Sequence, residues 1–258
     1  ITYVLDLVSE NIREIDLTSC PGIDKIDSDR VRVDLRPLMS ALAHNSYFNS
    51  VLLDEVLDES VLSSLGVAML SNKSITKISI NDTNSANKGG GMAIQALGEA
   101  LAMNPTNGIQ ALHLSGVNLR FGRAHERVFT GLQNLSHGLR SLVLRDCQMK
   151  PMHFSTLFHA FRNYGMSLAI EILDLSFNEL GEEGSADLGE WLQDSGASSP
   201  LTTLLLRRCS LHLKHVARHL SPLQHLTVLD LSENCLRGTT LIQLLCQTLD
   251  RVRISTLR

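Results

Sequence analysis

Aromatic side chains are scarce in this chain, where tryptophan, tyrosine and phenylalanine together make up 4% of 258 residues. The core must therefore be built mainly from aliphatic side chains. Lysine and arginine number 23 against 27 aspartates and glutamates, and they form no basic cluster of the kind that binds nucleic acid. No apolar run approaches the ~20 residues of a membrane span, and no signal peptide is recognisable. We therefore expect neither a nucleic-acid partner nor a membrane span.

Motifs that carry chemistry are also missing. No Ser/His/Asp or Cys/His constellation stands in a diagnostic local context. Lys88 and the glycines 89–91 precede an expected helix, but the order G-x-x-x-x-G-K-[ST] of a phosphate-binding loop is absent. A flexible strand-to-helix turn is the favoured interpretation. We expect no catalytic residues, no cofactor and no enzymatic activity.

Three histidines have helical spacing, at His212, His215 and His219. The last two form the i, i+4 pair that zinc-binding helices use. Apolar residues take the opposite face of this segment, namely Leu213, Val216, Ala217 and Leu220. We therefore expect the histidines to face solvent and predict no metal site. Trp191, the single tryptophan, lies between leucines at helical spacing, which favours core packing.

The chain does contain a repeated leucine pattern. Two copies fit L-x-x-L-x-L-x-x-N/C-x-L, the leucine-rich-repeat signature, with asparagine in the turn position at Asn178 and Asn234. Copies with cysteine or valine in the turn position centre on Leu142, Leu204 and Leu112, and weaker copies centre on Ile78, Val51 and Ile15. Ile254 and Leu257 begin a further copy. The sequence thus predicts about eight repeats and a truncated one.

Each part of the pattern has a physical reason. In L-x-L the two leucines point to the same side of a short strand, so both can enter a core. The asparagine or cysteine turns the chain, and its side chain can satisfy backbone groups of the neighbouring coil. One repeat cannot bury its apolar face alone, so the repeats must stack. The predicted fold class is an α/β leucine-rich-repeat solenoid, a horseshoe or arc with a parallel sheet on its concave face and helices on its convex face.

Helices are expected between the strands, over residues 61–70, 92–103, 213–220 and 241–249, where apolar residues recur with a period near 3.6. We expect one domain over residues 1–258, with an irregular insertion near residues 21–37. The first residue is not methionine and the last copy is incomplete, so a fragment of a longer protein is expected.

The five cysteines form no disulfide framework. Cys147 and Cys209 lie two repeats apart, which is about 10 Å at ~4.8 Å for each strand and exceeds the ~7 Å limit between Cα atoms. An odd count without framework spacing is typical of reduced thiols. We therefore expect an intracellular, cytoplasmic protein.

A partner-binding surface is expected on the concave face, where the residues between the core leucines are exposed. In the first repeats these residues are mostly acidic. In the later repeats, three arginines make the surface locally basic and apolar residues take several exposed positions. We predict that a protein partner binds Val143, Arg145, Ile172, Phe177, Leu205, Arg207, Arg208 and Val228. The alternative is that further repeats or flanking segments cover this patch.

The long repeats with full helices resemble the ribonuclease-inhibitor-like class of leucine-rich repeats. Within that class, three stretches resemble the CARMIL family, intracellular linkers of actin-capping protein and myosin-I. They are residues 34–48 (DLRPLMSALAHNSYF), the expected helix 61–70, and residues 93–104, which run into GEALAMNP. The resemblance implies a repeat domain between a pleckstrin-homology-like domain and a disordered tail. It would serve membrane-proximal placement, self-association or docking of a cytoskeletal partner. The basic, disordered capping-protein motif of that tail is not found here.

Two other functions stay open. One is a GTPase-activating solenoid resembling that for Ran, in which Asn81, Asp82, Arg145 and Arg207 would contact a small GTPase. The other is a ligand-sensing or inhibitory repeat domain, as in immune receptors or ribonuclease-inhibitor-like proteins. Those domains favour very regular repeats, and the uneven spacing of this chain argues mildly against them.

Overall fold

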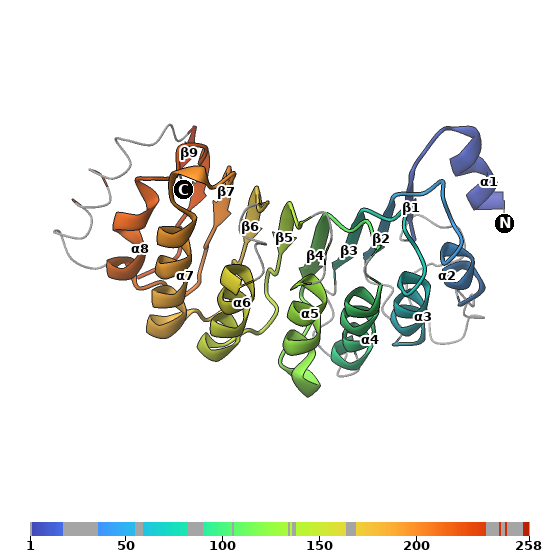
Figure 1. The fold of residues 1–258 in the computed structure, drawn as a ribbon, viewed down its shortest axis with the longest axis horizontal. Helices are drawn as coiled ribbons and strands as arrows, with labels where there is room; N and C mark the ends of the chain where they lie inside the picture. Colours follow the sequence, from blue (N-terminus) through green and yellow to red (C-terminus); the bar gives the residue numbers. More distant parts are fainter. Residues whose placement is uncertain are drawn as a thin grey trace. The chain divides into compact units, whose positions relative to one another are not determined.

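Each described copy of the leucine pattern contributes a short β-strand, and in most copies a helix follows it. The computed structural model describes residues 2–17, 36–54, 59–81, 90–104, 106–133, 135, 138–163, 169–235, 243, 246 and 255–257. The chain divides into two units, residues 1–137 and 138–258. In each unit, parallel strands form a sheet with helices on one face (Figure 1). The predicted leucine-rich-repeat architecture is confirmed.

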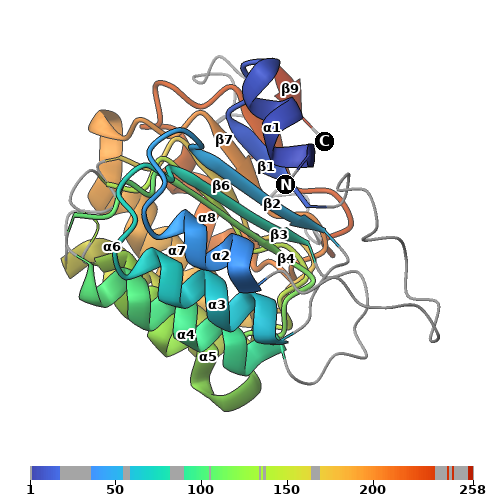
Figure 2. The same ribbon diagram turned by 90° about the vertical axis from the view of Figure 1, so that its right-hand side faces the viewer.

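The first unit begins with helix α1 (Thr2–Ser9). Its strands β1 (Glu14–Asp16), β2 (Ser50–Asp54), β3 (Lys77–Asn81) and β4 (Ala111–Ser115) pair in parallel and in sequence order. Helices α2 (Arg36–Leu42), α3 (Glu59–Met69), α4 (Gly90–Met103) and α5 (Ala124–Gln133) lie side by side along one face, and the short 3₁₀ helix η1 (Phe121–Arg123) precedes α5 (Figure 2).

The second unit repeats this order. Strands β5 (Ser141–Val143), β6 (Ile172–Asp174), β7 (Thr203–Leu205), β8 (Val228–Asp230) and β9 (Thr256–Leu257) pair in parallel. Helices α6 (Pro151–Asn163), α7 (Gly181–Ser195) and α8 (Leu213–Leu220) pack in that order, and η3 (Gly196–Ser198) extends α7. Strand β9 corresponds to the truncated copy.

The pattern residues form the core, as expected. Leu142, Leu173, Leu204 and Leu229, the central leucines of four successive strands, are each 0% exposed. In β5 and β7 the residues on either side of the central leucine are half-buried, because successive side chains point to opposite faces. Trp191 is also fully buried and stacks on Phe158, with 5.7 Å between ring centroids. This aromatic cluster joins α6 to α7.

In the second unit, the turn asparagines connect adjacent coils. The Asn178 side chain accepts hydrogen bonds from the Cys147 and Met149 N–H groups at 3.0 and 3.1 Å. It donates to the carbonyls of Leu144 and Leu175 at 2.6 and 2.8 Å. Asn234 makes the corresponding bonds to its own preceding coil. The predicted role of this position is confirmed.

In the first unit, asparagine side chains make similar hydrogen bonds at a different turn, which connects a helix to the next strand. Asn72 donates to the Leu42 carbonyl at 2.6 Å and accepts from the Ile75 N–H at 2.8 Å. Asn104 donates to the carbonyls of Met69 and Asn72 at 2.8 and 2.9 Å. The asparagines that follow α3 and α4 therefore support the weak early copies, which lack asparagine in the turn of the leucine pattern.

Several details differ from the sequence prediction. Residues 36 and 37 of the expected insertion begin helix α2, while 21–35 lie outside the described residues. Gly90 and Gly91 belong to the first turn of α4, so a helix start replaces the expected flexible turn. Leu70 and Met103, the last residues of the expected helices 61–70 and 92–103, are 41% and 73% exposed. The expected helix at 241–249 is described only at residues 243 and 246.

The histidines of α8 also differ in part from the prediction. His212 is exposed, but His215 and His219 are half-buried against α7. The reason is Gly189 of α7, where a Cβ atom would lie 2.2 Å from the His215 carbonyl oxygen, so the two helix backbones approach closely. Burial lowers the pKa of His219. Among the described residues, no group of three or more histidine, cysteine or acidic side chains could hold a metal.

Candidate functional site

The candidate site is the face of the second unit's sheet that points away from the buried leucines, together with the turns that follow its strands. The strand register places Ser141, Ile172, Thr203 and Val228 in one row across the sheet. Val143, Asp174, Leu205 and Asp230 form the next row. We call these eight residues the open sheet face. All of them are at least partly accessible except Asp174 and Asp230, at 6% and 8% exposure.

Four aliphatic side chains follow a zigzag across the open sheet face, from Val143 to Ile172, Leu205 and Val228. Successive members lie on adjacent strands, two positions apart along the strand. Strands are ~4.8 Å apart and residues rise ~3.3 Å each, so neighbouring side chains of the zigzag can touch. Ile172 is 38% exposed, which is high for a large aliphatic residue on a strand. The structure thus brings together the four apolar residues predicted from the sequence.

Between these aliphatics, two aspartates are held by their own turns. The Asp174 carboxylate accepts a hydrogen bond from the Ser176 N–H at 2.9 Å. Asp230 accepts from the Ser232 N–H at 2.9 Å and from the Ser232 hydroxyl at 2.5 Å. The two L-D-L-S segments therefore use aspartate to fix the start of the turn. A hydrogen-bonded carboxylate is retained at low exposure because its charge is partly compensated.

The predicted arginines gather around one aromatic ring in the turns. The guanidinium carbon of Arg145 lies 4.4 Å from the Phe177 ring centroid, and that of Arg207 lies 5.4 Å from it. Both distances are within the range of a cation–π interaction. Arg207 also donates from Nε to Glu233 Oε1 at 2.9 Å, and this ion pair raises the pKa of Arg207. Phe177 is consequently fixed between two cations.

One row of turn residues has an unusual backbone. Asp146, Phe177, Arg208 and Glu233 all have positive φ, between 51° and 62°. The turns are in register, because the Asp146 N–H donates to the Ser176 carbonyl at 2.9 Å and the Phe177 N–H donates to the Arg207 carbonyl at 2.8 Å. Left-handed backbone is uncommon for residues other than glycine and asparagine. We call these four residues the turn row.

A shallow hollow of about 310 Å³ lies beside the turn row, lined by Asp146, Phe177, Asn178 and Arg208. Asp146 and Arg208 are exposed, and neither has an ion-pair partner among the described residues. Arg145 contacts the Phe177 ring and has no ion-pair partner among the described residues. The hollow therefore offers one free carboxylate and one free guanidinium on either side of an aromatic ring.

The charge of this region differs from the prediction of a locally basic surface. Arg207 is neutralised by Glu233, and Asp146 stands beside Arg145. Phe177 and Arg208 lie in the turn row and not on a strand. Asp146 and Glu233 were not among the predicted partner-binding residues, although each immediately precedes the turn cysteine or asparagine. Their shared position in the repeat was the available signal.

The open face of the first unit is polar by comparison. Glu14 accepts a hydrogen bond from the Ser50 hydroxyl at 2.7 Å and lies 3.4 Å from the Lys77 ammonium group. The predicted acidity is thus offset by Lys77 among the described residues, and Glu55 and Asp82 lie outside them. The aliphatic zigzag belongs to the second unit.

The described cysteines are free thiols, buried at Cys147 and Cys209 and exposed at Cys235 and Cys246. Burial raises the pKa of Cys209 to about 12, so this thiol stays protonated and unreactive. Cys20 lies outside the described residues. No helix in the described part of the chain has the length and apolar character needed to cross a bilayer.

Comparison with protein-family models identifies the same repeat pattern. Residues 170–188 and 223–241 match the family model described as Leucine Rich repeat. No curated protein matches the chain. Among solved structures, an internalin (InlF) from Listeria monocytogenes matches at 12% sequence identity and a TM-score of 0.47. That match covers 95% of this chain and 60% of the internalin chain.

Proposed function

We propose that this chain is a non-catalytic protein-interaction scaffold that receives a protein partner on the open sheet face of residues 138–258. The observation that carries the proposal is the aliphatic zigzag, with Ile172 38% exposed at its centre. Partner surfaces of this kind combine a few apolar anchors with aromatic and arginine side chains. Phe177 and its two arginines supply those elements at the border of the zigzag.

The proposed biological setting is regulation of the actin cytoskeleton in the cytoplasm. Its support is the resemblance of residues 34–48, 61–70 and 93–104 to the CARMIL family. In the structure, residues 36–42 form α2, and 61–69 and 93–103 belong to α3 and α4, so much of the resemblance falls on the helical side of the first unit. In this setting the zigzag docks a cytoskeletal protein, and the scaffold itself performs no reaction.

The test compares partners recovered by the purified chain and by the double variant Ile172→Asp/Leu205→Asp, using quantitative mass spectrometry of cytoplasmic extracts. We expect actin-regulatory proteins to be recovered by the unchanged chain and lost by the double variant. Met152→Asp is the matched control, because Met152 is 69% exposed on helix α6 and receives the same apolar-to-acid change.

Recovery of the same partners by a folded double variant would contradict the docking face. If the recovered partners are unrelated to actin and the double variant loses them, the docking face is supported and only the proposed role in actin regulation is contradicted. An assay of GTP hydrolysis with a panel of small GTPases completes the test, and we expect no stimulation. Circular dichroism must show that both variants keep their helices.

A further inference from the structure

The turn row offers charges in a fixed order across three successive coils. Asp146 lies on the first coil, Phe177 on the second and Arg208 on the third, and the hydrogen bonds between their backbones keep them aligned. Adjacent parallel strands are ~4.8 Å apart, so Asp146 and Arg208 are about 10 Å apart. The hollow of about 310 Å³ lies along this line.

Ion pairs and ring contacts of the neighbouring side chains determine which charged groups in this hollow remain available to a ligand. Arg207 is occupied by Glu233, so the guanidinium left available on that coil is Arg208. Arg145 lies over the Phe177 ring, and the carboxylate of Asp146 on the same coil has no ion-pair partner among the described residues. Side chains of opposite sign thus flank the ring, and neither is paired within the described residues.

We infer that the turn row binds an extended segment of a partner protein that carries an acidic and a basic side chain about three residues apart. The acidic side chain faces Arg208, the basic side chain faces Asp146, and the residues between them cover Phe177. A segment in the extended polyproline II conformation rises ~3.1 Å per residue with three residues per turn, so positions i and i+3 lie on the same side and span about 9 Å, close to the spacing of Asp146 and Arg208. This inference rests on the proposed function, since the adjacent zigzag supplies the apolar part of the same docking surface.

The geometry selects a segment whose two side chains carry opposite charges. A segment with two acids would place one of them against Asp146, and a segment with two bases would place one against Arg208. Juxtaposed like charges are unfavourable, and such complementarity determines partner choice more than affinity. Each exposed ion pair should increase the affinity for the peptide by roughly threefold, and this increase becomes smaller as salt screens the charges.

The experiment measures binding of the full chain to an array of synthetic peptides. Every peptide has the same apolar residues, and the two positions i and i+3 carry glutamate with lysine, two glutamates or two lysines. The unchanged chain should prefer the mixed peptides in either order, because an extended peptide can bind in both directions. Asp146→Arg places two cations in the row and should shift the preference to two glutamates. Arg208→Glu places two anions there and should shift it to two lysines.

Both variants should fold, because the turn row itself accepts these residue types. Arg208 and Glu233 already adopt the same positive φ, 51° and 57°, as Asp146 at 53°. The altered side chains are exposed and have no ion-pair partner among the described residues. Peptide binding in raised salt gives a second readout, since the charge preference should shrink while apolar binding persists.

Three outcomes would overturn the inference: no binding of any peptide, equal binding of the three charge classes, or the same preference in all variants. The double variant Ile172→Asp/Leu205→Asp separates these failures from failure of the docking face. If the unchanged chain binds all three charge classes equally and the double variant binds none of them, the docking face is supported and the turn-row inference is wrong. If the double variant keeps all binding and the preferences still switch, the turn row binds peptides and the zigzag does not.

Discussion

At the scale of single residues, Asn178 holds the second unit together through one buried side chain. Replacing it with alanine leaves the Cys147 and Met149 N–H groups and the Leu144 carbonyl without their partner. A buried polar group without a hydrogen bond costs about 1–3 kcal/mol. We expect Asn178→Ala to lower the free energy of unfolding by roughly 3 kcal/mol, measured by urea denaturation with Trp191 fluorescence as the probe.

Asn234 provides the matched comparison for this substitution. It makes the same type of bonds, to the Cys209 and Leu211 N–H groups and the Leu206 carbonyl, but it is half-buried. Water can replace some of the hydrogen bonds that Asn234→Ala removes. This substitution should therefore lower the free energy of unfolding clearly less than Asn178→Ala does. Equal losses for the two variants would show that burial of the turn asparagine does not determine its contribution.

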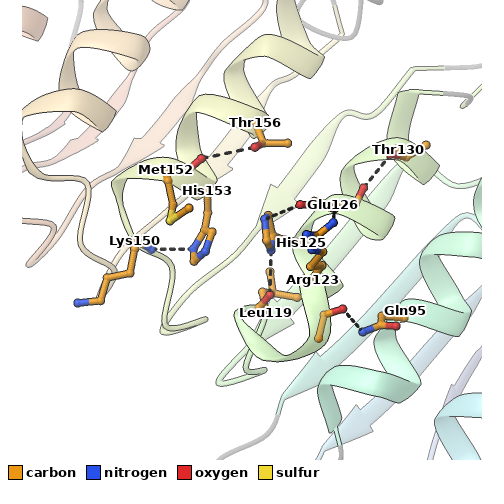
Figure 3. A network of polar contacts seen from close by, with 11 residues as sticks. Gln95, Leu119, Arg123, His125, Glu126, Thr130, Lys150, Met152, His153 and Thr156 are labelled. Atoms are coloured by element: carbon orange, nitrogen blue, oxygen red, sulfur yellow. Dashed lines mark hydrogen bonds and ion pairs between the residues drawn. The ribbon is translucent and has the colours of Figure 1, made fainter.

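His125 makes the first unit sensitive to pH. It is 8% exposed, its Nδ1 lies 3.3 Å from the Leu119 carbonyl oxygen, and burial lowers its pKa (Figure 3). The unfolded chain therefore takes up a proton near pH 6.5 while the folded chain does not, so the stability present above pH 6.5 decreases as the pH falls below it.

The measurement is amide hydrogen exchange over α5 at pH 7.5 and 5.5, corrected for intrinsic exchange rates. We expect protection to fall at the lower pH in the unchanged chain and to fall less in His125→Gln, which cannot take up the proton. An identical pH dependence in the two proteins would exclude His125 as the cause.

At the scale of elements, two glycines of α7 differ in the space that is available for a Cβ atom. A Cβ atom at Gly189 would lie 2.2 Å from the His215 carbonyl oxygen of α8. A Cβ atom at Gly184 would meet Leu180 and Phe154 side-chain atoms at 3.4 Å, an ordinary contact. Alanine is favoured over glycine within a helix by about 1 kcal/mol.

Gly189→Ala should consequently destabilise the protein by about 2 kcal/mol or more, since α8 must move away from α7. Gly184→Ala on the same helix should leave the stability unchanged or raise it by up to about 1 kcal/mol. Urea denaturation followed by Trp191 measures both. A stable Gly189→Ala variant would mean that α8 is free to shift.

The sequence predicts the strands of this protein better than its turns. Leu142, Leu173 and Leu204 were predictable because side-chain alternation forces each into the core. Phe177 was predicted on the same face as Ile172, because the residue pattern does not reveal that its φ is +62°. The Arg207–Glu233 pair was also missed, because its partners are 26 positions apart and meet only when the coils stack. Strand periodicity is local information, whereas contacts between turns depend on the register of neighbouring coils.

At the scale of the whole molecule, the stacking of repeats should confine the effect of damage. Within the first unit, β3 pairs with β2 and β4, and α3 and α4 pack on each other and on α2 and α5. Stability in such a repeat array is close to a sum of the repeats and their nearest-neighbour interfaces. A destabilised coil should therefore affect its neighbours most and distant coils least.

Ile78→Ala tests this expectation, because Ile78 of β3 is 0% exposed and its truncation costs about 2–5 kcal/mol. Hydrogen exchange should show the largest loss of protection in β3 and its neighbours β2 and β4. The urea transition reported by Trp191, which lies in the other unit, should keep its midpoint. A uniform loss of protection along the chain, with a lower Trp191 midpoint, would show that the repeats unfold as one cooperative body. The nearest-neighbour description would then not apply to this protein.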